Sequence, residues 1–289
     1  MQYRHSFHAG NFADVHKHVA LLALVEALQR KAKGFLYLDT HAGGGLYDLR
    51  GEQARRGGEA DSGIARVAAA DAPPPRTPEL AAYLAALARL RASTGAATYP
   101  GSPLLAAGAL RDVDRATCVE FIAQEARHLS RALDAIAGLT HGKVRVETGD
   151  GYAALASQLP PKERRALVLI DPPYESADEF TRLADALPEA LRRFDSGVYV
   201  IWFPVKRQRD TDLWLAKMTR VLEQPTLAAQ LWLHPRDTAV GLNGSGLLIV
   251  NPPWQADVRL SLWQEELRER LGGDAGSGSD VKWLVHERT

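Results

Sequence analysis

The sequence predicts an α/β fold built on a mostly parallel sheet, with a terminal antiparallel hairpin and an inserted helical subdomain. The aliphatic run at residues 166–170 has no polar position, which is typical of a strand buried on both faces. Strand-like and helix-like stretches alternate along the chain, as they do where helices join parallel strands. Apolar residues make up 46 % of the 289 residues and aromatic residues only 7 %, which indicates an aliphatic core.

Five stretches predict the strands of the parallel part of the sheet. They are residues 35–39, 117–121, 143–146, 166–170 and 198–203. Helical patterns follow at residues 123–137, 180–194 and 213–222. Right-handed crossovers through these helices bring the strands into one sheet.

The interval between the first two predicted strands is too long for one crossover helix. Within it, Leu80, Leu84, Leu87 and Leu90 mark one face of a helix predicted over residues 78–92. We therefore expect a helical subdomain over residues 51–98, inserted into a single domain that spans residues 1–289.

The last part of the chain predicts antiparallel pairing. Residues 228–233 and 246–250 are strand-like and only a dozen residues apart, which favours a hairpin. A glycine- and serine-rich turn at residues 273–279 precedes a last apolar piece, residues 281–285.

Composition excludes several classes of protein. The single cysteine, Cys118, rules out an intrachain disulfide framework and a four-cysteine zinc site, and its apolar surroundings predict a buried, inert thiol. No apolar stretch approaches the roughly 18–20 residues that span a bilayer. The amino terminus lacks the apolar core of a secretion signal. We expect a cytoplasmic protein with no membrane contact and no obligate protein partner.

Charge is balanced overall but not along the chain. The 35 basic and 35 acidic residues give no net charge, which by itself does not favour nucleic-acid binding. Basic residues nevertheless outnumber acidic ones over residues 1–34. A second basic cluster, Lys206, Arg207 and Arg209, follows the predicted strand at residues 198–203.

The motif Asp171-Pro172-Pro173-Tyr174 directly follows the strand predicted at residues 166–170. Open α/β sheets bind ligands outside the carboxyl ends of their strands. An exocyclic amine can give one hydrogen to the Asp171 carboxylate and one to the Pro172 carbonyl, while Tyr174 offers a face for stacking. The motif therefore predicts a clamp for a nucleobase amine, and the alternative is a tight turn that leaves a strand.

Further polar and glycine residues follow the first three predicted strands. Gly43-Gly44-Gly45 lies after the first, Glu120 ends the second, and Asp150-Gly151 follows the third. A carboxylate at the second position can bind both ribose hydroxyls, and Asp150 can accept an adenine amine. The glycine spacing fits neither a dinucleotide fingerprint nor a P-loop. Together these positions predict a nucleoside cofactor beside the amine clamp.

This ordered set resembles the S-adenosylmethionine-dependent N6-adenine methyltransferases. Four further segments, YRHSFHAGNFADVHKH (residues 3–18), FLYLDTHAG (35–43), YPGSP (99–103) and NPPW (251–254), are similar to the RlmJ family, whose members methylate adenine N6 in 23S ribosomal RNA. The resemblance covers most of the chain. It implies a Rossmann-like class I methyltransferase fold, S-adenosylmethionine as cofactor, 23S ribosomal RNA as partner and no metal.

The resemblance also implies roles for single residues. Asp171, with Pro172, Tyr174 and Lys17, is expected to be catalytic, and Tyr3 and Arg4 are expected to contact RNA. The residues expected to bind the cofactor are His18, His41, Ser102, Glu120, Asp150, Gly151 and Asp171. Two alternatives are a methyltransferase acting on DNA adenine or guanine N2, and an RNA-binding protein that keeps only a vestigial fold.

Two features have competing interpretations. His5, His8, His16 and His18 invite a metal site, but His16 and His18 point to opposite sides of a helix and no acid or cysteine cluster completes a site. We expect residues 1–18, which offer little to bury, to be mobile in the free protein and more ordered with cofactor and RNA bound. Asn251-Pro252-Pro253-Trp254 matches the amine clamp, but an antiparallel strand before it would place it away from the catalytic rim.

Overall fold

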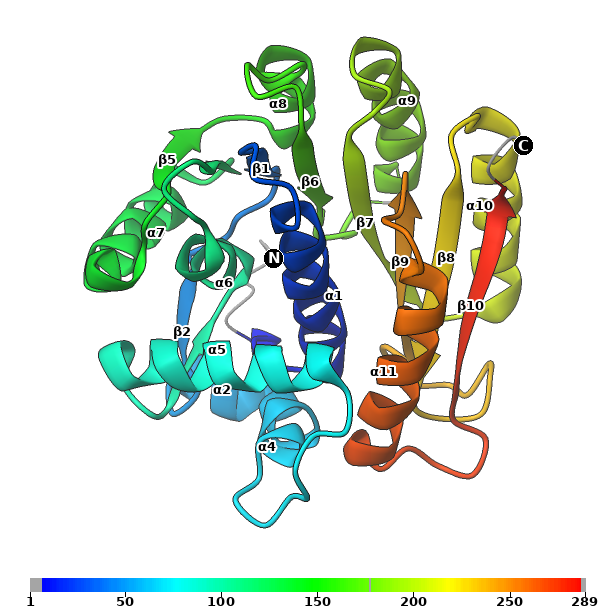
Figure 1. Ribbon diagram of the computed structural model, residues 1–289. Helices are drawn as coiled ribbons and strands as arrows, with labels where there is room; N and C mark the ends of the chain where they lie inside the picture. The colour runs from blue at the N-terminus through cyan, green and yellow to red at the C-terminus, as the bar shows by residue number, and fades with distance from the viewer. Residues whose placement is uncertain (1–6, 177, 287–289) are drawn as a thin grey trace.

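A mixed eight-stranded sheet in the order β10-β8-β9-β7-β6-β1-β4-β5 forms the centre of the computed structural model (Figure 1). The structure describes residues 7–176 and 178–286. The strands of this sheet are β1 (Leu36–Asp39), β4 (Arg115–Glu120), β5 (Lys143–Thr148), β6 (Ala166–Ile170), β7 (Val198–Val205), β8 (Thr226–Trp232), β9 (Gly244–Val250) and β10 (Gly278–Val285). The helices are α1 (Phe12–Gln29), α2 (Glu52–Gly57), α3 (Glu59–Ser62), α4 (Ile64–Val67), α5 (Pro78–Thr94), α6 (Ser102–Ala109), α7 (Ala123–Ala135), α8 (Gly151–Gln158), α9 (Glu179–Arg193), α10 (Gln208–Val221) and α11 (Ala256–Leu271).

Five neighbouring strands, β5-β4-β1-β6-β7, run parallel and confirm the predicted α/β fold. Counted along the chain, without two short strands outside this sheet, their order is 3-2-1-4-5, that of a Rossmann sheet. The strand order reverses at β1, which pairs with β4 on one side and β6 on the other. Ligands of open α/β sheets bind at the carboxyl ends beside such a reversal.

The predicted hairpin is confirmed as β8 and β9, which pair antiparallel. Strand β9 also pairs antiparallel with β7, so it lies between β7 and β8. In Figure 1 the arrows of β9 and β10 point upward, opposite to that of β6. Because both β7 and β8 oppose β9, they run in the same direction and end at the same edge of the sheet.

The core divides into two apolar clusters, one on each face of the sheet. Alternate residues of a strand serve different clusters: Leu167 packs with helices α1, α5, α6, α7 and α11, whereas Val168 packs with α8, α9 and α10. Both faces of β6 are therefore buried, as the unbroken aliphatic run predicts. Cys118 of β4 is buried and free, as predicted.

The interval between β1 and β4 contains five helices, α2 to α6, and a small sheet that the sequence did not reveal. Strands β2 (Leu46–Asp48) and β3 (Thr98–Pro100) pair antiparallel at the two ends of this interval. Leu80, Leu87 and Leu90 of α5 are buried in the same cluster as α1 and α6. The insert therefore packs on the main core. Among the described residues, no helix is both long and apolar enough to cross a bilayer.

The expectation that residues 1–18 have little to bury is wrong for the part of this segment that the structure describes from residue 11 on. Helix α1 begins at Phe12, and the Asn11 side chain caps it by accepting a hydrogen bond from Asp14 N at 2.8 Å. Distant residues supply partners for the polar side chains: Ser245 for His16 and Tyr99 for His18. Tyr3, Arg4 and His5 lie outside the described residues.

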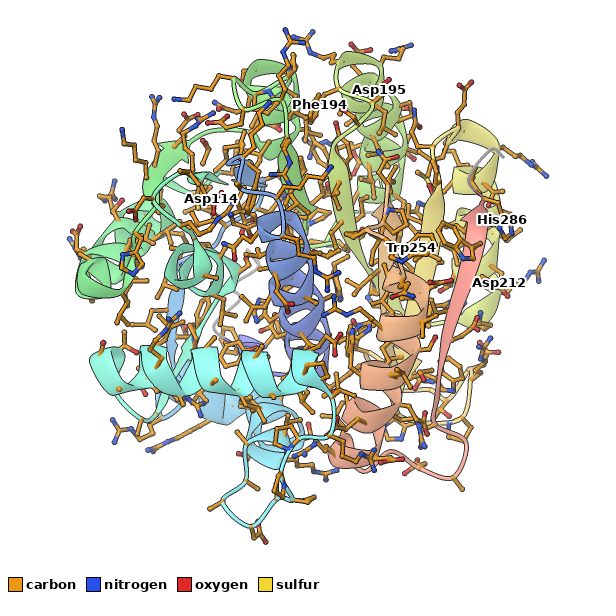
Figure 2. The ribbon with its side chains drawn as sticks, in the orientation of Figure 1. Asp114, Phe194, Asp195, Asp212, Trp254 and His286 are labelled. Carbon is orange, nitrogen blue, oxygen red and sulfur yellow. The ribbon has the colours of Figure 1, made fainter. Side chains whose placement is uncertain are left out.

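The second Pro-Pro motif lies at the opposite edge of the sheet, as predicted. Strand β9 ends at Val250 beside Tyr199, near the start of β7. The Asn251 amide donates to the backbone carbonyls of Asp195 and Gly197, both at 2.7 Å. Figure 2 shows Asp195 at the top of the molecule, at the amino end of β7, and Trp254 near the start of α11. Asn251 thus closes a loop and does not lie at the carboxyl ends of the parallel strands.

Candidate active site

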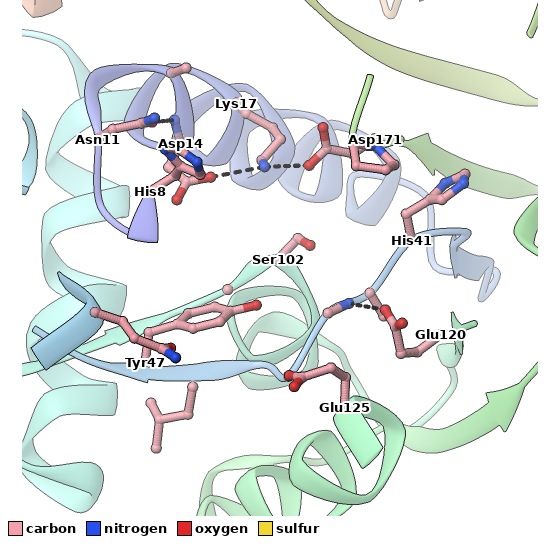
Figure 3. A pocket seen from close by; sticks show the side chains of 18 of the residues that line it. His8, Asn11, Asp14, Lys17, His41, Tyr47, Ser102, Glu120, Glu125 and Asp171 are labelled. Atoms are coloured by element: carbon pink, nitrogen blue, oxygen red, sulfur yellow. Dashed lines mark hydrogen bonds and ion pairs between the residues drawn. The ribbon is translucent and has the colours of Figure 1, made fainter. Parts of the chain in front are cut away.

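One cavity of about 1390 Å³ opens at the carboxyl ends of β1, β4 and β6 (Figure 3). It contains most of the residues that the sequence nominated. Those that line it are Lys17, His18, His41, Ser102, Glu120, Asp171, Pro172 and Tyr174. Asp150 and Gly151 are not among its lining residues. The cavity is larger than the roughly 300–1,000 Å³ of ordinary ligand pockets, which leaves room for a cofactor and a second ligand.

Lys17 holds the Asp171 carboxylate in place. Its ammonium nitrogen lies 2.5 Å from Oδ2 of Asp171 and 2.9 Å from Oδ1 of Asp14, and Figure 3 shows it between the two acids. The side chains of Lys17 and Asp14 are almost fully buried, and that of Asp171 is 15 % exposed. Asp171 therefore keeps its other oxygen, Oδ1, for a ligand in the cavity.

The buried trio of Asp14, Lys17 and Asp171 carries one surplus negative charge when all three are ionised. Burial alone lowers the pKa of the Lys17 ammonium, but the two carboxylates outweigh it and raise that pKa well above its usual range. Lys17 is accordingly a permanent cation at neutral pH. The net charge of the trio favours a cationic ligand nearby.

The loop after β1 and the acid that ends β4 form a second wall. Gly43 has a φ of +63°, and its N–H donates to Oε2 of Glu120 at 2.8 Å, while Ile122 N donates to Oε1 at 2.7 Å. Burial raises the pKa of the Glu120 carboxyl, although both N–H groups oppose that shift. Each carboxylate oxygen has two lone pairs and can accept about two hydrogen bonds. Each oxygen of Glu120 uses one of them for a backbone N–H, so Glu120 can still accept hydrogen bonds from a pair of hydroxyls in the cavity.

Ser102 lines the cavity at the start of α6 and is bonded to the acid that ends β1. Oδ2 of Asp39 accepts hydrogen bonds from Ser102 and Tyr37, each at 2.7 Å. Burial raises the pKa of Asp39 to about 6 despite these two donors. Asp39 itself does not line the cavity, so it acts on the site through the orientation of Ser102.

Two histidines, His18 and His41, line the cavity, and their contact with the cofactor stays a prediction. Nδ1 of His41 lies 2.8 Å from Oγ1 of Thr40, whose hydroxyl donates to the Leu169 carbonyl, so His41 carries its hydrogen on Nδ1 and Nε2 is an acceptor. Burial lowers the pKa of His41 to about 4, which leaves it neutral near pH 7. Nδ1 of His18 lies 2.9 Å from the Tyr99 hydroxyl.

The motif after β6 forms the third wall. Within the described chain, no hydrogen bond ends on the Pro172 carbonyl. Tyr174 has a φ of +50°, and its hydroxyl donates to the Trp202 carbonyl at 2.6 Å. Its ring packs against Phe180 and Trp202, with centroids 4.7 and 5.6 Å apart. The aromatic group is therefore held rigidly beside Asp171.

Asp150 and Gly151 have structural duties at the amino end of α8. Asp150 caps the helix by accepting from Tyr152 N at 2.8 Å and pairs with Arg182 at 3.0 Å. A Cβ on Gly151 would lie 2.0 Å from the Thr40 carbonyl oxygen, so only glycine fits against the loop after β1. Their expected contact with the cofactor stays a prediction.

Sequence reasoning missed a polar network that reaches from Asp171 into the insert. Asp14 belongs to this network because it accepts a hydrogen bond from Lys17, which also binds Asp171. Asn11 extends the network, since its side-chain amide donates a hydrogen bond to Glu59 Oε2 at 2.9 Å. His8 Nδ1 lies 2.7 Å from Glu59 Oε1. The available signal was an asparagine three residues before an acid at the start of a helix, which is a capping pattern. Among the described residues, no group of three or more side chains is arranged to hold a metal ion.

Comparisons with known proteins give consistent matches over nearly the whole chain. The family model described as "Ribosomal RNA large subunit methyltransferase D, RlmJ" matches residues 32–285. A protein of Escherichia coli K12 named ribosomal RNA large subunit methyltransferase J is 36 % identical over 99 % of this chain and 100 % of its own length. A Haemophilus influenzae protein of the same name is 34 % identical over the same shares. The crystal structure of a Legionella pneumophila protein superposes with a TM-score of 0.81 at 31 % identity, over 95 % of this chain and 98 % of that one.

Proposed function

The chain belongs to the RlmJ family of ribosomal RNA large subunit methyltransferases, and we propose that it transfers a methyl group from S-adenosylmethionine to the N6 amine of an adenine in 23S ribosomal RNA. One observation carries the proposal. Asp171, anchored by Lys17, and the Pro172 carbonyl lie in the same cavity as Glu120 and the glycine-rich loop. An acceptor pair for an amine thus adjoins a wall suited to a nucleoside.

The clamp acts on the lone pair of the target nitrogen. In adenine this pair is delocalised into the ring, so the amine is a poor nucleophile. When Asp171 and the Pro172 carbonyl accept its two hydrogens, the nitrogen moves toward tetrahedral geometry and the pair becomes localised. As the nitrogen gains the methyl group it must lose one proton, and the Asp171 carboxylate accepts it.

Lys17 and Asp14 prepare Asp171 for this work. The Lys17 ammonium fixes Oδ2 and leaves Oδ1 toward the cavity. Asp14 shares that cation, so Asp171 does not neutralise it alone and remains a good acceptor. Orientation before reaction saves the cost of arranging the groups during it.

The proposed cofactor is S-adenosylmethionine, which would supply a methyl group activated by a sulfonium charge, and the cavity of about 1390 Å³ has room for it. Glu120 would hold the ribose hydroxyls, and Ser102, His18 and His41 would line the remainder of the cofactor site. The negative trio of Asp14, Lys17 and Asp171 complements a sulfonium, and neutral His41 does not oppose it. Asp150 and Gly151 belong to the same proposal, although they do not line the cavity.

The RNA half of the proposal requires an unpaired or flipped adenine. A base inside a helix cannot reach Asp171, which lies within a cavity, so the base must leave its stack. Tyr174, held by Phe180 and Trp202, offers the surface on which it would rest. Tyr3 and Arg4 are proposed to contact RNA, and the protein is proposed to work in the cytoplasm.

Methyl transfer to unmodified 23S ribosomal RNA, with duplex DNA as the competing substrate, tests the function. We expect N6-methyladenosine in the RNA and none in the DNA. Methylation of DNA instead would support the alternative DNA methyltransferase. Calorimetry with S-adenosylhomocysteine tests the other alternative, an RNA-binding protein that keeps only a vestigial methyltransferase fold. Binding of the compound would exclude this alternative, and lack of binding would contradict the proposal.

A further inference from the structure

A group of basic side chains lies at the sheet edge that carries Asp171. Strand β7 is parallel to β6, and β8 runs in the direction of β7, so Ile170, Val205 and Trp232 end these strands on one side of the molecule. Lys206, Arg207 and Arg209 follow β7, and Arg236 follows β8. We call these four exposed cations the β7–β8 rim.

The rim is continuous with the active-site cavity. Lys206 lines that cavity together with Trp202 and Pro204 of β7, and so do Gly241 and Leu242 of the loop between β8 and β9. Asp237 of this loop accepts a hydrogen bond from Gln208 N at 2.8 Å, which ties the loop to the start of α10. The rim therefore adjoins, through Lys206, the cavity that contains Asp171.

The four cations have no acidic partners within the described parts of the chain. No carboxylate oxygen lies within 4.0 Å of Lys206, Arg207, Arg209 or Arg236 there, whereas many other arginines of the protein pair with acids. Acids are present nearby, but Asp237 and Asp212 bind Gln208 and Asp274 binds His234. Asp210, exposed in the first turn of α10, is the remaining acid of this segment.

Arg236 is held in a position to bind a ligand. Its guanidinium lies 4.1 Å from the centroid of the Trp232 ring, and the Trp232 indole donates to the Gly276 carbonyl at 3.0 Å. Stacking on an indole uses the face of the guanidinium and leaves its edge donors free to point outward. An arginine edge binds two phosphate oxygens at once.

We propose that the β7–β8 rim binds the phosphodiester backbone of the RNA strand on one side of the target adenine. The inference rests on the proposed function and adds the surface along which the strand approaches. Phosphates next to the flipped nucleotide lie outside the cavity, where the rim supplies cations that form no ion pair with an acid of the described residues. A chain with no net charge can bind RNA this way because these four cations, which have no acidic partner in the described chain, are grouped beside the site.

The test compares two double variants of helix α10. Arg207→Ala/Arg209→Ala removes two rim charges at its amino end. Lys217→Ala/Arg220→Ala removes two exposed cations near its carboxyl end, away from the rim. Binding of an unmodified 23S ribosomal RNA transcript is measured over a series of salt concentrations, and S-adenosylhomocysteine binding is measured by calorimetry.

We expect the rim variant to weaken RNA binding about tenfold and to reduce the salt slope by about 1.4, since each lost single-strand phosphate contact removes roughly 0.7. Arg236→Ala should reduce the slope by a further 0.7 or so. Binding of S-adenosylhomocysteine should not change. The control variant should keep the RNA affinity and salt slope of the wild type.

Equal affinities and equal salt slopes for the rim and control variants would overturn the inference, while methylation by the wild type would leave the proposed function standing. Failure of the proposed function looks different. The wild-type protein would then leave 23S ribosomal RNA unmethylated, and the substrate named in this inference would be wrong as well.

Discussion

The ammonium nitrogen of Lys17 lies 2.5 Å from Oδ2 of Asp171, although 154 positions separate the two residues in the chain. The contact joins helix α1 to the carboxyl end of β6, the strand next to β1. The same nitrogen bonds Asp14, so a buried cation is shared by two acids. This arrangement connects the family's N-terminal segment directly to the proposed catalytic carboxylate.

Asp171→Ala should abolish methylation and leave S-adenosylmethionine binding within about tenfold of the wild type. The alanine variant loses the amine acceptor, yet Lys17 keeps Asp14 as a partner, so no unpaired charge is buried. Asp171→Asn should retain more activity because its amide oxygen still accepts one hydrogen bond. Turnover assays and calorimetry measure both effects, and substantial turnover by the alanine variant would contradict the clamp.

Asp14→Asn should lower kcat about tenfold with little change in cofactor affinity, because Lys17 would then be drawn entirely to Asp171. The control is Asn11→Ala, which removes the helix cap at a cost of about 1 kcal/mol of stability but leaves the Asp14–Lys17–Asp171 contacts intact. Kinetics and thermal unfolding of both variants separate positioning from folding. Equal kcat values for the two variants would show that Asp14 is only structural.

His16→Leu should weaken the pH dependence of stability. Burial lowers the pKa of His16 to about 3, and within the described chain its Nε2 has no hydrogen-bond partner. In the unfolded chain His16 has a pKa of about 6.5 and becomes protonated below that pH, whereas in the folded protein it stays neutral. The free energy of unfolding therefore falls as the pH falls below about 6.5. Urea unfolding measures the free energy of unfolding at pH 8 and at pH 5. The difference between these two values should be about 2 kcal/mol smaller in the variant than in the wild type. His141→Leu, at an exposed position, is the control and should behave as the wild type.

Asn251→Ala combined with Trp254→Ala should reduce stability and leave kcat nearly unchanged. The Asn251 amide closes the loop at the amino end of β7 through two hydrogen bonds, worth about 1–3 kcal/mol together. Trp254 is 79 % exposed and contributes little. A large fall in kcat with an unaltered melting temperature would mean that the second Pro-Pro motif takes part in catalysis.

Local sequence patterns predicted the parallel sheet and the polar residues at the carboxyl ends of its strands. An unbroken aliphatic run indicates a strand with two buried faces, and the residue after such a strand lies at the carboxyl edge. For this reason Glu120 and Asp171 could be assigned to the same edge of the sheet, and in the structure both line the same cavity. The direction of β9 likewise followed from the short connection to β8, and it placed Asn251 at the end of the sheet opposite Asp171, as the structure shows.

Contacts between distant residues could not be predicted in this way. Asn11 to His18 look too polar to bury, and only the folded chain supplies Asp171, Tyr99 and Ser245 as their partners. Asp150 sits at the expected edge, but a helix cap and Arg182 already engage it.

By itself the sequence determined the strands of the main sheet, the directions of most of them and the chemistry available at the carboxyl edge, because these depend on the residues within one segment. The tertiary structure decided which of those groups share a cavity and how charge is divided among them. A buried lysine is stable only where acids from other segments meet it, since removing a charge from water requires compensation that no local pattern specifies.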